Sequence, residues 1–330
     1  MRLFRKTGTR RSHRRTTSAS VLTALTLLGV TAASLPAQAG SDAAVPAGSA
    51  LPVAAAGAPS VVQPYGTTQV GEPLYRVGPG RHLPAVVPVD RPFKAIITVE
   101  TPTGDREYRV FVPTGLSGAA PTLIAMGGYT ERVEPETYMR WEQSATRHHF
   151  VVLYPRGRGL SFNAGRCCGM ASREGYGDDA FLLQMLGVQR DLYPEDISRL
   201  YLTGFSNGGM MAYRFACEHP SMVAAIGVVA AAYMASPGCR PKKPVPVMHI
   251  HGRLDGAVPW RGARYSRMLQ TSIPTVPQTD AVFGHLDYWA NVPVRNVYLA
   301  RVGHVWPHAN GAGSYDATGQ LTLFLLHFRR

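Results

Sequence analysis

Charged residues are scarce in this sequence, and acidic residues are absent from its first 41 positions. Only 17% of the 330 residues are charged, whereas Gly (34) and Pro (26) are plentiful. A coiled coil or a disordered chain would carry far more charge. The composition therefore predicts a globular protein with many turns, large enough for one big domain or two modest ones.

The region without acids has the layout of an export signal. Its basic head holds seven cations, Arg2, Arg5, Lys6, Arg10, Arg11, Arg14 and Arg15. The apolar stretch 21–35 that follows is shorter than the ~20 residues that span a bilayer, which argues against a transmembrane anchor. Small residues then lead to Ala39. We expect residues 1–39 to be a signal peptide cleaved near Ala39, giving a secreted protein without a stable membrane anchor.

The formal net charge of +13 is largely a property of that leader. Removing its seven cations from 34 leaves 27 basic against 21 acidic residues, a net charge of +6. The remaining cations form no basic stripe and no nucleic-acid motif. The sequence therefore predicts no nucleic-acid partner.

The chain has few cysteines, four in all: Cys167, Cys168, Cys217 and Cys239. No CxxC pair and no nearby histidine cluster suggests a metal site, so we expect neither metal nor cofactor. Export favours disulfides. Because adjacent cysteines rarely bridge each other, we expect Cys167 and Cys168 to pair with Cys217 and Cys239, in either order.

The pattern along the chain divides it into four parts. Residues 1–39 are the signal and 40–65 an Ala/Pro/Gly linker, 66–92 stay unassigned, and 93–330 form the catalytic domain. In that domain a hairpin (94–113) precedes alternating buried strands and helices, including helices at 136–149 and from Asp178, where Asp178 and Asp179 are expected to cap the first turn. This predicts an α/β fold, with a mostly parallel sheet, an N-terminal antiparallel hairpin, helices on both faces and no lid domain.

Ser206 lies in the sequence Gly204-Phe205-Ser206-Asn207-Gly208, which fits G-x-S-x-G. The motif alone is weak, but here it follows an apolar strand and precedes a helix, which is the setting of a nucleophile elbow. The alternative is a tight turn without chemistry. Bulky residues at 204 and 208 would clash with the adjoining strand and helix, so we interpret Ser206 as a nucleophile.

A general base and an acid follow at later strand ends. His304 comes just after a predicted strand and is the preferred base; His249 and His251 are competitors and His308 is a weaker one. Asp255 follows the strand that contains His251. Alone it would be a turn residue, but the order Ser206, Asp255, His304 is that of α/β-hydrolase triads.

Two backbone N–H groups are expected to stabilise the oxyanion. One belongs to Asn207, at the start of the helix that follows Ser206. The other belongs to Tyr129, after the turn Gly127-Gly128. A plain turn at Gly127-Gly128 is the alternative.

Several stretches together resemble the secreted polyhydroxybutyrate-depolymerase-like esterases, a group that includes feruloyl and acetylxylan esterases. They are FNAGRCCG (162–169), YGDDAFL, YLTGFSNGGMMAYRFAC (201–217), HIHGRLDGAVPW (249–260) and GHVWP. The resemblance implies an α/β-hydrolase over about 95–328, with Ser206 as nucleophile, Asp255 as acid and His304 as base. Gly127 departs from it, because the family usually has His-Gly at 127-128.

These features predict a secreted serine esterase that forms an acyl-enzyme, acting on an ester carried by a polymer or oligomer. Tyr129, Trp260 and Trp306 are the candidates for lining its substrate, with ordinary packing as the alternative. Two other functions stay open. One is a catalytically weakened binding protein on the same fold, suggested by Gly127, and the other is a serine peptidase.

Overall fold

The computed structural model describes residues 60–86, 88, 90–130, 133–235, 239–284, 293–311 and 313–330. The predicted signal peptide and residues 40–59 of the linker lie outside this range. Within it, no helix is both long and apolar enough to cross a membrane.

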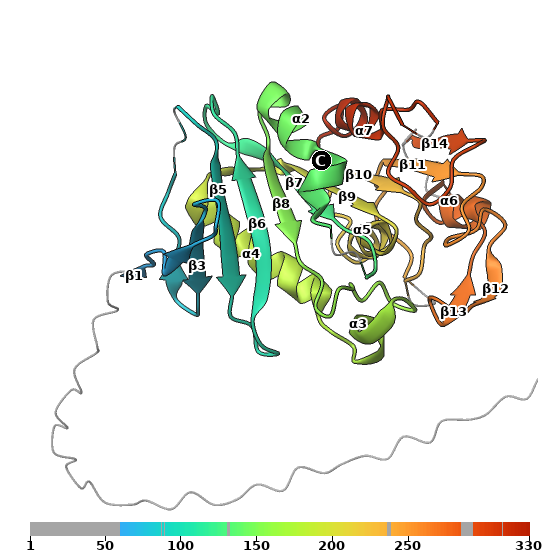
Figure 1. Ribbon diagram of the computed structural model, residues 1–330, viewed down its shortest axis with the longest axis horizontal. Helices are drawn as coiled ribbons and strands as arrows, with labels where there is room; N and C mark the ends of the chain where they lie inside the picture. The colour runs from blue at the N-terminus through green and yellow to red at the C-terminus, as the bar shows by residue number, and fades with distance from the viewer. Residues whose placement is uncertain are drawn as a thin grey trace, which may run out of the picture. The chain divides into compact units, whose positions relative to one another are not determined.

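A ten-stranded sheet forms the centre of the fold (Figure 1). In spatial order the strands are β14 (Val294–Leu299), β11 (Val247–Gly252), β10 (Ala225–Val229), β9 (Glu195–Phe205), β7 (Ala120–Met126), β8 (Val151–Pro155), β6 (Arg106–Val112), β5 (Phe93–Val99), β3 (Pro73–Val77) and β2 (Gly66–Thr67). From β14 to β8, every neighbouring pair of strands is parallel. All residues of β7, β8, β10 and β11 are buried, as expected for strands covered on both faces.

The antiparallel hairpin predicted at 94–113 is formed by β5 and β6, which pair from Phe93↔Val112 to Val99↔Arg106. The unassigned segment 66–92 also belongs to the sheet. Its strand β3 runs parallel to β5, and β2 pairs antiparallel with β3 at the edge. The short β1 (Ser60–Val61) and β4 (Arg81–His82) pair with each other. Strands this short, separated by Gly and Pro, carry too little alternation to be identified from sequence.

Helices cover both faces of the sheet, as predicted. One apolar cluster includes α4 and α5, and the other includes α1, α2 and α7. The helices are α1 (Pro135–Met139), α2 (Trp141–His148), α3 (Gly169–Arg173), α4 (Asp178–Leu192), α5 (Asn207–Glu218), α6 (Val276–Gly284) and α7 (Ala317–Leu325).

The single helix predicted at 136–149 is wrong, because the structure has two helices there. Arg140 adopts a left-handed conformation (φ 56°) and separates α1 from α2. Both of its neighbours, Met139 and Trp141, are completely buried. Residues two positions apart in one continuous helix point about 200° apart, on nearly opposite faces, so the break lets both side chains enter the core.

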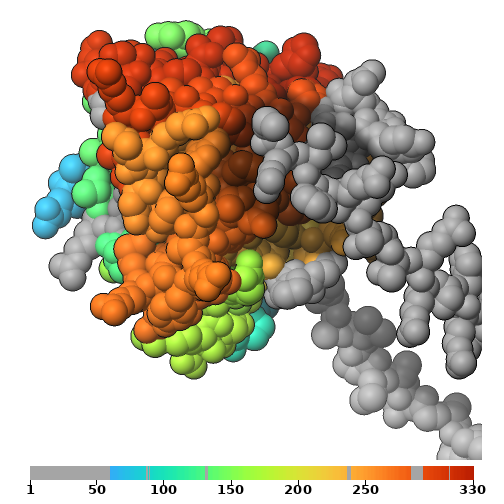
Figure 2. Space-filling model, turned by 90° about the vertical axis from the view of Figure 1, so that its right-hand side faces the viewer, coloured from blue at the N-terminus to red at the C-terminus, as the bar shows by residue number. Residues whose placement is uncertain are grey.

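An unpredicted insertion lies between β11 and β14. It contains a small antiparallel pair, β12 (Ala263–Ser266) and β13 (Thr271–Ile273), followed by α6. In Figure 2 the orange segment of β12 and β13 covers much of one face, beside the red C-terminal segments. The connection between β10 and β11 has no helix or strand among its described residues, 230–235 and 239–246.

The predicted cysteine pairing is wrong. Cys167 bridges Cys168, and Cys217 bridges Cys239 with 6.2 Å between their Cα atoms. The Cys168 sulfur lies 3.9 Å from that of Met210, at the start of α5. Cys217 is seven residues further along this helix, about 10 Å away at 1.5 Å per residue. Cys168 therefore packs near the start of α5 and Cys217 lies near its end, where Cys239 is within the usual Cα range for a disulfide.

Removal of the Cys217–Cys239 bridge should destabilise the protein. Replacing both residues with alanine frees a loop closed across 22 positions and is expected to lower the free energy of unfolding by about 3 kcal/mol. Urea denaturation of the double variant and the parent measures the difference. A loss below about 1 kcal/mol would show that the bridge constrains the unfolded chain little.

Candidate active site

Ser206 occupies the turn between β9 and α5 and has an unusual backbone conformation, with φ 53° and ψ −118°. A positive φ is uncommon for a non-glycine residue, and this φ/ψ pair lies outside the left-handed helical region, so the surroundings must hold it in place. Here the Ser206 N–H donates to the Val229 carbonyl on β10, at 2.9 Å. The Ser206 carbonyl accepts from Met210 in α5, also at 2.9 Å. The turn is therefore held from both sides, and the serine is 4% exposed.

The glycines around Ser206 are required by close backbone contacts, as predicted for positions 204 and 208. A Cβ atom on Gly204 would approach the backbone of Gly208 to 2.3 Å. A Cβ atom on Gly208 would lie 2.2 Å from the Met126 carbonyl oxygen at the end of β7. Both distances are far below van der Waals contact, so α5 packs here backbone to backbone against β9 and β7.

Gly208→Ala is expected to destabilise the protein by about 1–3 kcal/mol, because the end of β7 must move away from α5. Gly187→Ala provides a matched control. Gly187 also lies within a helix, but its added Cβ would meet no atom within 4 Å. That substitution should stabilise by about 0.5–1 kcal/mol, since Ala favours helix over Gly. Thermal melting distinguishes the two; similar effects would argue against the tight elbow.

The candidate oxyanion donors lie on adjoining elements. Met126 pairs with Gly204 across β7 and β9, so the turn after β7 starts beside the elbow. Asn207 is the first residue of α5, where backbone N–H groups have no partner within the helix. Tyr129 follows the turn and is half-buried, with its ring against Gly169.

The Asn207 side chain has a role that sequence reasoning missed. Its oxygen accepts from the Phe162 N–H at 2.7 Å, and its amide donates to the Phe162 carbonyl at 2.9 Å. Asn207 is completely buried. The start of α5 is therefore tied to the loop 161–168, whose motif FNAGRCCG was the only sequence signal for this contact.

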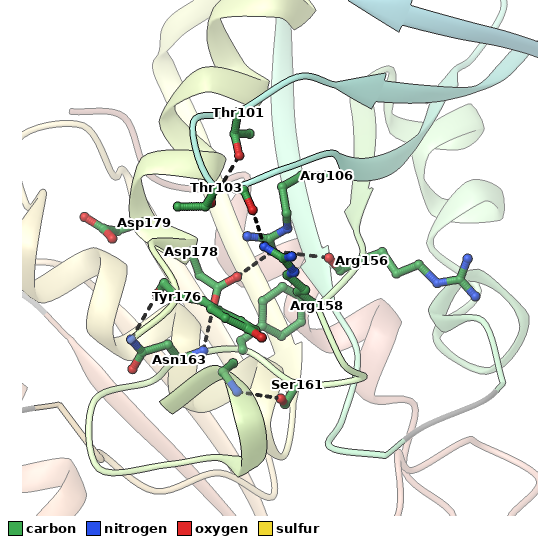
Figure 3. A network of polar contacts seen from close by, with 12 residues as sticks. Thr101, Thr103, Arg106, Arg156, Arg158, Ser161, Asn163, Tyr176, Asp178 and Asp179 are labelled. Carbon is green, nitrogen blue, oxygen red and sulfur yellow. Dashed lines mark hydrogen bonds and ion pairs between the residues drawn. The ribbon is translucent and has the colours of Figure 1, made fainter. Parts of the chain in front are cut away.

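That loop is held in turn by a buried ion pair (Figure 3). Asp178 accepts from Arg106 at 2.5 Å and from the Asn163 N–H at 2.7 Å. The prediction that Asp178 caps α4 is therefore wrong, because its carboxylate makes no capping bond. Asp178 is completely buried, and its partner Arg106 arrives from β6, a contact that local sequence does not reveal. Asp179 points away from this network and lies 3.7 Å from Arg214.

Asp255 and His304 are in direct contact. The His304 Nδ1 lies 2.8 Å from Asp255 Oδ2, while Asp255 Oδ1 accepts from the N–H groups of Ala257 and Val258. Their two loops run together, since the Leu254 N–H donates to the Val302 carbonyl at 2.9 Å. The carboxylate is buried and the imidazole is 22% exposed, so one side of the ring is accessible.

The His304 ring packs against Phe205, the neighbour of Ser206, with 4.7 Å between ring centroids. This places the imidazole beside the elbow. Among the described residues, Ser206 Oγ and His304 form no hydrogen bond. Such contacts are often long in free enzymes and tighten when substrate binds.

The competing histidines differ from His304 in their surroundings. His249 and His251 are completely buried in β11 and bond to each other, at 3.1 Å. Burial, with a contribution from His249, lowers the pKa of His251 to about 4. His308 lies near Arg140, and burial followed by that charge lowers its pKa. Of these histidines, only His304 combines a bond to Asp255 with contact beside Ser206.

One group in the described part of the chain has the spacing of a metal site, Asp179, Glu218 and His219. Arg214 lies 3.7 Å from Asp179 and 2.9 Å from Glu218. Its charge already neutralises part of this group, which we interpret as an ion-paired surface.

Part of the chain is similar in sequence to curated proteins, and the fold is similar to solved structures. No protein-family model matches the chain. It is 28% identical over 151 residues to the bifunctional acetylxylan esterase/xylanase XynS20E of Neocallimastix patriciarum, covering 46% of this chain and 21% of that protein. It is 26% identical over 134 residues to the poly(3-hydroxyalkanoate) depolymerase C of Paucimonas lemoignei, covering 39% and 32%. The matched region is thus less than a third of either relative.

Solved structures show the same fold. A poly(3-hydroxybutyrate) depolymerase from Bordetella parapertussis superposes with a TM-score of 0.51 at 14% identity, covering 73% of this chain and 92% of that one. A thermostable esterase also gives 0.51, at 17% identity, with 72% and 63% covered. The fold is that of the α/β-hydrolases. In sequence, part of the chain is similar to an acetylxylan esterase and to a poly(3-hydroxyalkanoate) depolymerase.

The aromatic candidates for substrate contact differ in accessibility within this chain. Trp306 is 5% exposed, packs against Tyr138 and Trp141, and donates its indole N–H to Thr318. It therefore offers little ring surface to a substrate. Trp260 is half-buried, with its ring edge-on to Tyr298 at 4.2 Å and Arg253 over its face.

Two apolar side chains beside Asp255 and His304 were not singled out from the sequence. Leu254 precedes Asp255 and is 66% exposed, and Val305 follows His304 and is 41% exposed. Exposed apolar residues flanking a polar site often contact a ligand. The sequence offered no signal for them, because exposure depends on the tertiary structure.

Proposed function

We propose that the protein is a secreted serine esterase that hydrolyses carboxylic esters through an acyl-enzyme. The observation that carries the proposal is the 2.8 Å contact between Asp255 and His304, beside the strained turn that presents Ser206. The names of its relatives support an ester of acetylated xylan or of a hydroxyalkanoate polymer as substrate. The Cys217–Cys239 bridge supports export, because disulfides persist in oxidising compartments.

In the proposed reaction, the Ser206 hydroxyl attacks the ester carbonyl while His304 takes its proton. Asp255 accepts from the His304 Nδ1–H, which leaves Nε2 free to act as base and stabilises the imidazolium. The N–H groups of Asn207 and Tyr129 stabilise the developing oxyanion. His304 then protonates the leaving alcohol, and water hydrolyses the acyl-enzyme by the same steps in reverse.

A screen of the purified full-length chain against esters tests this proposal. Short-chain p-nitrophenyl esters report activity, and feruloyl, acetyl-xylan and hydroxybutyrate-oligomer esters compare the acyl groups and alcohols. Hydrolysis that is lost in both Ser206→Ala and His304→Ala supports the esterase. Absence of hydrolysis of every ester would favour a binding protein instead, consistent with Gly127 in place of the family's histidine.

A further inference from the structure

A continuous chain of buried polar groups leads away from Asp255 into the core. His251 Nε2 lies 2.9 Å from the Val258 carbonyl and 3.5 Å from Asp255 Oδ2. His251 Nδ1 lies 3.1 Å from His249 Nε2, and His249 Nδ1 lies 2.6 Å from Asp280 Oδ1. The Tyr298 hydroxyl donates to the other Asp280 oxygen at 2.8 Å.

The hydrogen bonds in this series of buried groups determine which ring nitrogens of His249 and His251 carry a hydrogen. A carbonyl only accepts, so His251 Nε2 must carry a hydrogen that it donates to Val258. An ionised carboxylate also only accepts, so His249 Nδ1 must carry a hydrogen that it donates to Asp280. The contact between the two rings needs one more hydrogen. Three of the four ring nitrogens are therefore protonated, one more than two neutral imidazoles hold.

The additional proton belongs on His249. Burial lowers the pKa of His251, which favours the neutral form of that ring. His249 is also buried, but its Nδ1 faces the Asp280 carboxylate, so an imidazolium there is paired with an opposite charge. His249 then donates to His251 Nδ1, and His251 donates through Nε2. An unpaired Asp280 carboxylate in this core would be costly, and the shared proton neutralises it.

We propose that His251 is a positioning residue for Asp255, held in its donating tautomer by an imidazolium–carboxylate pair between His249 and Asp280. The inference rests on the proposed esterase function. His251 fixes Val258, and the Val258 N–H donates to Asp255 Oδ1 at 2.8 Å. The same Nε2–H faces Asp255 Oδ2, the oxygen that contacts His304. Both oxygens of the acid are thus oriented from the core side.

The other groups around the hydrogen-bond network from His251 to Asp280 are compatible with these protonation states. Tyr213 and Trp260 approach the rings of His249 and His251 edge-on, at 6.0 and 6.1 Å. The Arg253 guanidinium lies over the rings of Trp260 and Tyr298, at 4.5 and 5.9 Å from their centroids. Among the described residues, the acidic and basic side chains in contact with this hydrogen-bond network are Asp255, Asp280, His304 and Arg253.

Kinetics of two His251 variants test the positioning role. His251→Leu removes the donor at similar volume and is expected to lower kcat about 10- to 100-fold, the cost of losing one strong hydrogen bond, with little change in KM. His251→Gln offers an amide N–H to Val258 and should restore most of kcat. Thermal melting verifies that both variants fold. An unchanged kcat in His251→Leu, or equal losses in both variants, would overturn the proposal.

A second pair of variants tests Asp280. In Asp280→Asn the amide group can donate to His249 and its oxygen can accept from Tyr298, so the direction of every other bond is kept. This variant should retain most of kcat, whereas Asp280→Leu should lose about as much as His251→Leu. Equal activity of Asp280→Leu and the parent would contradict the proposed chain.

Long-range ¹H–¹⁵N NMR of the histidine rings tests the proton count without relying on activity. Spectra of the full-length Ser206→Ala chain, assigned with His249→Gln and His251→Gln, should show three protonated nitrogens among the four. Asp280→Asn should reduce the count to two. A count of two in the parent would overturn the proton assignment, whereas a correct count in a chain that cleaves no ester would disprove only the proposed function.

Discussion

Ser206→Ala is expected to lower the rate of ester hydrolysis by about 10⁴–10⁶-fold, because it removes the hydroxyl on which the proposed acyl-enzyme forms. A fluorophosphonate probe should label the parent and fail to label the variant. Ser198→Ala is a suitable control, since Ser198 lies near the other end of β9 and its hydroxyl donates to Asp196 at 2.6 Å. Labelling that persists in Ser206→Ala would place the nucleophile elsewhere.

The backbone of Ser206 adds a further comparison. Alanine at 206 keeps the strain of a positive φ, whereas glycine adopts that conformation freely. Both variants should be inactive, but Ser206→Gly should unfold at a higher temperature than Ser206→Ala, since relief of strain is worth about 1–3 kcal/mol. Glycine's larger chain entropy offsets about 0.5–1 kcal/mol of this gain. A lower melting temperature for the glycine variant would contradict a strained elbow.

The largest loss of stability is expected at the buried ion pair in Figure 3. Asp178→Asn should lower the free energy of unfolding by about 3–5 kcal/mol, because Arg106 is 4% exposed and would keep an uncompensated charge in the core. Asp179→Asn is the matched control, one residue away on the same turn. Its carboxylate is 30% exposed and 3.7 Å from its cation, so the loss should stay below about 1 kcal/mol.

The two partners of this pair should differ in their effects. After Arg106→Met, Asp178 keeps the Asn163 N–H and the favourable start of α4, so this change should cost less than Asp178→Asn. The double variant Arg106→Met/Asp178→Asn should also be more stable than Asp178→Asn alone, because no charge remains buried. Urea denaturation of the parent, the two single variants and the double variant gives the coupling free energy between positions 106 and 178. Additive losses would show that the two side chains do not act as a pair.

Much of the fold could be predicted from the sequence because its signals are local. The buried strands β7 and β8 and the hairpin of β5 and β6 each arise from a pattern in consecutive residues, which can be recognised in the sequence. Elements with weak local signals were missed, among them β2 and β3, the pair β12 and β13, and α3 and α6. The break at Arg140 was missed as well, because it serves the burial of two neighbouring side chains rather than any preference of Arg itself.

The candidate site also combines residues that the sequence predicted with contacts that only the structure shows. Ser206, Asp255 and His304 were predicted from their places after three strands, because parallel strands bring their carboxyl ends to one edge. Position on an edge does not settle which side chains touch. The structure adds the contact of Asp255 with His304, the bonds of Asn207 to Phe162, and the chain from His251 to Asp280.

The sequence by itself therefore determined the α/β class, the positions of the main strands along the chain and the candidates for nucleophile, acid and base. These follow from apolar periodicity and from glycine positions, which act within a few residues. Only the tertiary structure decided which cysteines bridge, that Asp178 pairs with Arg106 rather than capping α4, and that His249 and His251 form a buried chain behind Asp255. Each of those outcomes depends on distances between residues far apart in the chain, and such distances are set by how the helices pack on the sheet.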